Sequence, residues 1–327
     1  MQSIPKLDLS HFIEGSAEQK SEFVAELGNA YEQIGFVAIR NHRIPTDTLK
    51  VLYQEVANFF SLPESNKLKY GDTEGGGQRG YTGFGKEHAK NQNAGDLKEF
   101  WHFGQYQILA DHPYPANKQV TELLNFNVAG EDVFRALENT GVQILRAIAL
   151  HLKLDEFYFD DLVTKGNSIL RAIHYPPITG DPKEAIRAGE HEDINLITLL
   201  VGASADGLEV LNKHDQWIGV TEVEDHIVVT VGDMLQRLTN DQLKSTTHRV
   251  VNPPKNQWEK PRYSIPFFLH PRPSVPLNCL PQCISEENPK GHPMMAQPAM
   301  QQGKWLGENI VLKINKQPLK PFVYNDK

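Results

Sequence analysis

The sequence contains little cysteine, no excess of basic residues and no long apolar run, and each absence excludes a class of protein. The two cysteines, Cys279 and Cys283, are too few for a disulfide-built secreted fold, and no further Cys or His follows them at metal-site spacing. The net charge is −8, from 33 basic and 41 acidic residues, so a general nucleic-acid-binding surface is not expected. No apolar stretch is long enough to span a membrane.

The rest of the composition is that of a globular protein. Apolar residues make up 39% of the 327 positions and charged residues 23%. The opening segment MQSIPKLDLS lacks the basic flank and apolar run of a signal peptide. We therefore expect a cytoplasmic monomer whose partner is a small molecule, and neither a nucleic acid nor a membrane.

The first 165 residues are expected to be mostly helical. Ser16 and Gln19 form a capping-box pattern, after which apolar residues recur at helical spacing up to residue 34. Similar stripes occupy residues 49–59 and 118–153, and the run at residues 35–42 predicts a strand. Residues 71–95 are rich in Gly, Gln and Asn and predict a long loop, a feature that tends to form lids or binding elements.

The pattern changes near residue 167. Short β-rich runs, separated by turn residues, read SILRAIHY, NLITLLV, LEVL, WIGV, HIVVTV, HRVV and RYSIPFFL. Such runs indicate a β-sandwich or barrel. We therefore expect one domain over residues 1–327, with a mostly helical region (1–165), a β core that carries the metal site (166–272) and an irregular, Pro-rich segment that forms a closing helix or a cover (273–327).

The run GEHEDINLITLL contains the sharpest chemical signal. His191 and Asp193 are two residues apart at the start of a β run, so we expect both side chains to leave one face of a strand and converge on a cation. His248 lies at the start of a later strand and would supply a third ligand. Two His and one carboxylate that leave open positions form the facial arrangement of non-haem Fe(II) oxygenases. With 13 His in the chain, a chance H-x-D is the alternative.

A receptor for a carboxylate is expected on a further strand. Arg262 and Ser264, in PRYSIPFFL, alternate onto one face. A buried guanidinium beside a hydroxyl can bind a carboxylate through charge-assisted, bidentate hydrogen bonds. The alternative is a surface arginine in a salt bridge.

Ordered sequence blocks extend these motifs over residues 4–272. The blocks are IPKLDLS, GFVAIRNHRIP, FFSLPESNKLKY, GYTGFGKE, DLKEFWHFG, HYPP, GLEVL, VGDMLQRLTND and STTHRVVNPP. In this order, and with H-x-D, a later His and R-x-S, the sequence resembles the isopenicillin N synthase-like family of 2-oxoglutarate- and Fe(II)-dependent oxygenases. The family motif falls on His191, Asp193, His248, Arg262 and Ser264.

The resemblance implies a mainly β fold with flanking helices, a distorted double-stranded β-helix (jelly roll). It implies a dioxygenase that uses Fe(II), 2-oxoglutarate and O2 to oxidise a small molecule, with hydroxylation expected and succinate and CO2 released. The far carboxylate of 2-oxoglutarate would meet Arg262 and Ser264. Tyr175, in the HYPP block, matches a tyrosine that often completes that pocket; a core tyrosine is the alternative.

The sequence departs from the family pattern at two places. His248 and Arg262 are farther apart than is common, which predicts a longer hairpin loop. The usual Asn-Tyr-Tyr-Pro-Pro reads Ile173-His174-Tyr175-Pro176-Pro177. Both changes leave the three metal ligands intact and affect only the expected contacts of the co-substrate.

Substrate contacts are expected from residues that border the site in relatives or share a face with the motif residues. For each of them, packing in the core is the alternative reading. The candidates are Arg79, Tyr81, Phe84, Phe100, His102, Arg171 and Phe268.

Three other functions fit parts of the pattern. Some relatives bind iron without 2-oxoglutarate and cyclise or fragment the substrate, in which case Arg262 and Ser264 would hold a substrate carboxylate. A non-catalytic binding protein could use the same scaffold, but it would be expected to lack a ligand. A zinc hydrolase can use two His and one Asp, yet it has no need for the Arg-x-Ser receptor.

Overall fold

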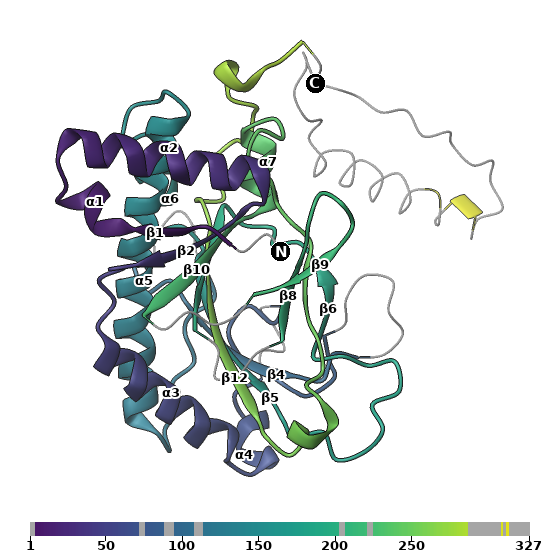
Figure 1. Cartoon of the computed structure of the whole chain (residues 1–327). Coiled ribbons are helices and arrows are strands. Elements are labelled where there is room, and N and C mark those ends of the chain that lie inside the picture. Colours follow the sequence, from purple (N-terminus) through teal and green to yellow (C-terminus); the bar gives the residue numbers. More distant parts are fainter. Residues whose placement is uncertain are drawn as a thin grey trace.

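Two β-sheets form the centre of the molecule, and helices lie along the outer side of the larger sheet (Figure 1). The computed structural model describes residues 4–71, 76–87, 95–107, 114–202, 207–220 and 225–286, together with 309, 312 and 313. Most of the segment expected to form a closing helix or a cover lies outside these residues, as do parts of the long loop expected at 71–95.

The main helices each bury one apolar stripe. Helix α2 (Ala17–Gln33) begins at a capping box formed by Ser16 and Gln19, as predicted. Helix α3 (Thr46–Phe60) packs against the long helix α5 (Leu124–His151), which also contacts four strands of the larger sheet. No helix of the described residues is long and apolar enough to cross a bilayer. The shorter elements are α1 (Leu9–Ile13), α4 (Glu64–Leu68), α6 (Asp160–Val163), α7 (Asp233–Leu238) and the 3-10 turns Lys255–Gln257 and Pro281–Cys283.

The larger sheet has eight strands in the order β1-β2-β10-β7-β12-β5-β4-β3. Half of them come from the β-rich runs after residue 167: β5 (Ile169–Tyr175), β7 (Ile197–Val201), β10 (His226–Val231) and β12 (Arg262–Leu269). The other half come from the region expected to be mostly helical. The larger sheet therefore combines strands from both sides of the boundary that was expected near residue 165. These are β1 (Lys6–Asp8), β2 (Phe36–Arg40), β3 (Gly80–Thr82) and β4 (Glu99–Gly104).

The smaller sheet has four strands in the order β6-β11-β8-β9. They are β6 (Ala188–His191), β11 (His248–Val250), β8 (Leu208–Leu211) and β9 (Trp217–Gly219). Strands β6 and β11 pair antiparallel with His191 opposite His248. Two packed sheets with this strand order confirm the predicted jelly-roll core with flanking helices.

The apolar core is divided unequally by the larger sheet. The main cluster fills the space between the helices and that sheet. A second cluster, between the two sheets, contains only six buried residues: Phe100, Ile173, Tyr175, Ala188, Leu208 and Val250. Since so few apolar side chains fill the space between the sheets, polar side chains and cavities can occupy the rest of it.

Candidate functional site

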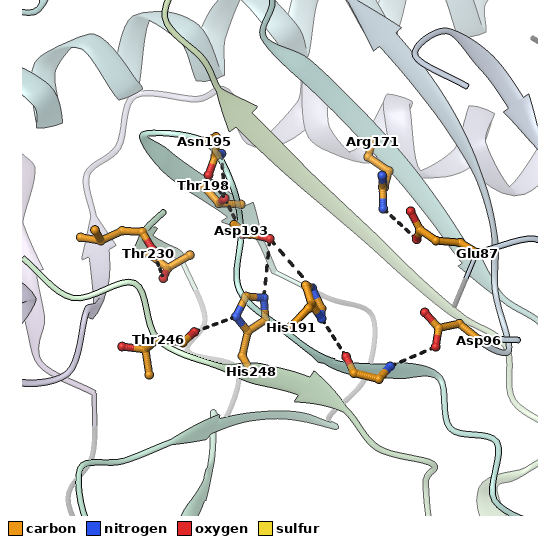
Figure 2. Close-up of polar contacts among 12 residues, drawn as sticks. Glu87, Asp96, Arg171, His191, Asp193, Asn195, Thr198, Thr230, Thr246 and His248 are labelled. Carbon is orange, nitrogen blue, oxygen red and sulfur yellow. Dashed lines mark hydrogen bonds and ion pairs between the residues drawn. The ribbon is translucent and has the colours of Figure 1, made fainter. Parts of the chain in front are cut away.

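Three potential metal ligands converge at one end of the smaller sheet (Figure 2). One ligand atom each of His191, Asp193 and His248 lies within 4.8 Å of the others. The Nε2 atoms of both histidines are 3.9 Å from Asp193 Oδ1. The expectation of one shared strand face is wrong in detail, because β6 ends at His191 and Asp193 lies in the turn before β7. The turn still places the Asp193 carboxylate beside the two imidazole rings.

Backbone carbonyl groups fix the orientation of both imidazole rings. The Nδ1 atom of His191 donates to the carbonyl of Gly189 at 2.7 Å, and that of His248 donates to the carbonyl of Thr246 at 3.1 Å. A carbonyl only accepts, so in both neutral rings the proton resides on Nδ1. The lone pair of each Nε2 atom therefore points to the shared space, as a metal ligand requires.

A hydroxyl and an amide hold the carboxylate between the two rings. Thr198 Oγ1 donates to Asp193 Oδ2 at 2.6 Å, and Asn195 Nδ2 donates to Thr198 Oγ1 at 3.0 Å. This chain of hydrogen bonds leaves Asp193 Oδ1 as the oxygen that faces the histidines. Sequence reasoning did not identify Thr198 or Asn195, because their contact with Asp193 depends on the shape of the turn.

The electrostatic setting favours the neutral form of His191. Burial, and then the adjacent His248 ring, lower the pKa of His191, although Asp193 acts in the opposite direction. The His191 side chain is still 40% exposed, because it borders open cavity space. Two imidazole nitrogens, one carboxylate oxygen and an open side form a donor set that fits Fe(II). The residues present are therefore suited to the metal that the motif implies.

An inner cavity extends from the three ligands between the sheets. Arg262, Ser264 and Tyr175 line it together with His191, Asp193 and His248. Arg262 is only 1% exposed, and its guanidinium carbon is 5.0 Å from the centroid of the Tyr175 ring, which is its partner across β12 and β5. The structure thus brings together all three residues that were expected to receive a carboxylate.

An outer cavity of about 370 Å³ adjoins His191 and Asp193. This volume is in the usual range for small-molecule sites. Three of the expected substrate contacts, His102, Arg171 and Phe268, line it beside His191 and Asp193. Arg171 and Phe268 line the inner cavity as well, so the two spaces meet at the ligands.

A chain of ion pairs crosses the wall of the outer cavity. Lys98 contacts Asp96 at 2.8 Å and Glu87 at 2.7 Å, and Glu87 contacts Arg171 at 3.1 Å (Figure 2 shows the last pair). Burial alone would raise the pKa of Glu87, but Arg171 and Lys98 outweigh it and hold the pKa at about 2. Each of these four charges therefore has an opposite partner.

The chain of polar contacts ends at a neutral histidine. Arg171 Nε donates to His102 Nε2 at 2.6 Å, while His102 Nδ1 donates to the carbonyl of Gly77 at 2.8 Å. Burial and the neighbouring Arg171 hold the pKa of His102 well below its usual value. His102 thus orients Arg171 without adding a charge.

The structure does not bring the other four expected contacts into either cavity. Phe100 lies under the Arg171 guanidinium, 4.2 Å from ring centroid to Cζ, within the inter-sheet cluster. The Tyr81 hydroxyl donates to Glu99, and its ring packs on Phe59. Arg79 is buried and donates to Asn167 at 2.9 Å, and Phe84 is 53% exposed.

Sequence comparisons agree with this geometry. Residues 4–127 match the N-terminal family described as non-haem dioxygenase in morphine synthesis, and residues 166–271 match the 2OG-Fe(II) oxygenase superfamily. The 2-oxoglutarate-Fe(II) type oxidoreductase hxnY of Emericella nidulans is 32% identical over 305 residues, which cover 89% of this chain and 86% of that protein.

Solved structures give the same result. A protein of Caulobacter crescentus assigned to the 2OG-Fe(II) oxygenase family is 37% identical, with a TM-score of 0.81 and coverage of 94% of this chain and 99% of that one. A full-length Neurospora crassa protein in complex with alpha-KG and thymine is 32% identical, with a TM-score of 0.79 and coverage of 89% and 92%. The chain belongs to the 2-oxoglutarate–Fe(II) oxygenase superfamily and is an enzyme that uses Fe(II), 2-oxoglutarate and O2 to oxidise a small molecule.

Proposed function

We propose that this enzyme hydroxylates a small, uncharged molecule. In this proposal His191, Asp193 and His248 bind the iron, and the inner cavity holds 2-oxoglutarate with its far carboxylate at Arg262, Ser264 and Tyr175. The outer cavity holds the substrate. The observation that carries the proposal is that His191 and Asp193 line both cavities, so that a co-substrate in one cavity and a substrate in the other can reach the same metal.

The protein's part in the reaction is to position groups and exclude water. When bound, iron and 2-oxoglutarate supply the activation of O2, and 2-oxoglutarate leaves as succinate and CO2. The carbonyl groups of Gly189 and Thr246 keep both rings in the tautomer that binds metal, and Thr198 prevents rotation of the Asp193 carboxylate. The planar guanidinium of Arg262 can bind a carboxylate through two parallel hydrogen bonds.

The ion pairs of the outer cavity are the reason for proposing an uncharged substrate. Among the residues that the structure describes there, Asp96, Lys98, Glu87 and Arg171 neutralise one another, and His102 is neutral. Apart from the ligand Asp193, the remaining carboxylate of the wall, Glu192, is exposed to solvent and accepts a hydrogen bond from Thr247 Oγ1. A charged substrate group that contacts these four paired residues would have to leave water without gaining a free counter-ion, which is unfavourable. Apolar and aromatic surface from Ile169, Ile194 and Phe268 completes the wall.

The relatives include an example of this substrate class, since the Neurospora crassa protein has been solved with thymine, an uncharged ring. We expect neutral heterocycles of that size to be turned over faster than free amino acids or carboxylic acids. A panel of both kinds, assayed for succinate release and a mass gain of one oxygen, tests this expectation. Faster turnover of amino acids would show that the pocket carries an unbalanced charge.

The roles of the site residues can be tested before the substrate is known. Anaerobic addition of 2-oxoglutarate to the Fe(II) protein should produce a visible charge-transfer band. The band should be lost in Asp193→Ala and should require more 2-oxoglutarate in Arg262→Gln. Absence of the band in the wild-type protein would favour an iron oxidase that does not use 2-oxoglutarate. The monomeric state and cytoplasmic location stay predictions.

A further inference from the structure

Arg187 is a buried cation to which the proposed function gives no role. Its side chain is 2% exposed and immediately precedes β6. Its Nη2 atom donates to the carbonyl of Lys260 at 3.2 Å, and its Nε atom is buried without a hydrogen-bond partner. No carboxylate among the described residues forms an ion pair with it.

A second guanidinium lies close to Arg187, with the Tyr175 ring as their shared neighbour. The Cζ atoms of Arg187 and Arg262 are 5.8 Å and 5.0 Å from the centroid of that ring. The two cations are therefore at most about 11 Å apart. Burial, and then the like charge of Arg262, lower the pKa of Arg187 to about 10, which still leaves it charged at neutral pH.

The nearest charged groups are engaged elsewhere. Arg187 shares a separate pocket with Glu209, but the Glu209 carboxylate accepts a hydrogen bond from Arg249 Nε at 2.8 Å. Lys98, the other cation near Tyr175, is neutralised by Asp96 and Glu87. No described carboxylate therefore balances the charge of Arg187. Because an unbalanced buried charge is costly, an anion that bound nearby would stabilise this region.

We propose that Arg187 is a positioning residue for 2-oxoglutarate. Its positive charge, which makes no direct contact with the ligand, attracts the far carboxylate of 2-oxoglutarate by long-range electrostatics. Arg187 is not among the residues that line the inner cavity, so it acts by charge and not by direct contact. Its presence would favour a 2-oxo acid with a second carboxylate over one with a neutral tail. This inference rests on the proposed function, which places that carboxylate at Arg262.

The inference is tested by equilibrium binding, which does not require turnover. Two unit charges about 10 Å apart at an effective dielectric constant of about 20 change an affinity roughly tenfold. Calorimetry with Mn(II) in place of iron should therefore show that Arg187→Gln weakens 2-oxoglutarate binding roughly tenfold. Arg187→Lys keeps the charge and should bind within about threefold of the wild type.

A matched ligand separates charge from shape. 2-Oxovalerate has the same chain length as 2-oxoglutarate but ends in a methyl group, so Arg187→Gln should leave its affinity within about twofold. Equal weakening of both ligands, or equal weakening by Gln and Lys at position 187, would mean that Arg187 only supports the Lys260 carbonyl, and would overturn the inference.

An Arg262→Gln variant in the same titrations distinguishes this inference from the proposed function. If Arg262→Gln weakens 2-oxoglutarate binding and Arg187→Gln does not, the inference fails and the proposed co-substrate site stands. If Arg262→Gln has no effect, the co-substrate site itself is misplaced. The rise in melting temperature on adding 2-oxoglutarate should also be smaller in Arg187→Gln than in the wild type.

Discussion

Thr198→Val tests whether metal binding depends on a hydroxyl group that contacts a metal ligand and not the metal itself. Thr198 is 3% exposed and donates to Asp193 Oδ2 at 2.6 Å. Valine has a similar shape, so the change removes mainly the hydrogen bond. A hydrogen bond to a charged group contributes about 1.5–3 kcal/mol, and loss of such outer contacts lowers metal affinity about 10–100-fold. We expect the Mn(II) dissociation constant to rise by that factor.

The mechanism behind this prediction is loss of orientation. With Thr198 in place, Asp193 presents one oxygen, Oδ1, to both histidines at 3.9 Å. Without the hydroxyl, the carboxylate is free to rotate, while Asn195 keeps its other hydrogen bond, to the carbonyl of Ile197 at 2.9 Å. The fold around the turn should therefore survive, and circular dichroism should be unchanged.

Anaerobic calorimetry with Mn(II) provides the assay, and Thr198→Ser is the matched control. Serine keeps the hydroxyl and should bind metal within about threefold of the wild type. A Val variant that binds Mn(II) within twofold of wild type would refute the argument, since the hydrogen bond at Asp193 would then contribute nothing to the site. A loss in Ser as large as that in Val would also contradict the argument, because serine keeps the hydroxyl group that donates to Asp193.

Three further predictions concern the ligands, the ion pairs and the backbone. Asp193→Ala should abolish metal-dependent succinate formation, and succinate at the wild-type rate would contradict the ligand assignment. Ionised Glu87 stabilises the fold above its ordinary pKa of 4.5, and this contribution is lost as pH falls toward about 2. The melting temperatures of wild type and Glu87→Gln should therefore differ at pH 6 and converge near pH 2; a constant difference would contradict the pairing with Arg171 and Lys98. Gly35→Ala, at φ +70° with its new Cβ 2.1 Å from the Lys244 carbonyl oxygen, should lose on the order of 3 kcal/mol in urea unfolding, whereas Gly180→Ala has open space and should be near neutral.

The sequence predicted the β core because its strands repeat a simple local pattern. Runs such as HIVVTV and RYSIPFFL became β10 and β12 with one face buried against the helices. Strands β1, β3 and β4 were harder to predict. Their pairing partners lie far away in the chain, and a three-residue strand such as Gly80–Thr82 has too few residues to show alternation.

The convergence of His191, Asp193 and His248, and that of Arg262 with Ser264, could be predicted because each set belongs to a short motif on or beside a strand. The ion-pair chain was not, because its contacts join Glu87, Lys98 and Arg171, three residues from separate segments that only the folded sheets bring together. The side chain of Tyr81 shows the same limit. Sequence placed it near the site, whereas its hydroxyl is bound to Glu99, away from both cavities.

The unequal division of the core explains why the charges gather between the sheets. The helix-side cluster is large and apolar, so it can stabilise the larger sheet without help from the other face. The inter-sheet face is then free to carry buried polar groups that would be too costly in a small protein core. Asp96, Lys98, Glu87 and Arg171 compensate one another there, but Arg187 is compensated by no described carboxylate. If 2-oxoglutarate binds as proposed, its second carboxylate would bring the opposite charge that this region lacks and would raise the stability of the protein.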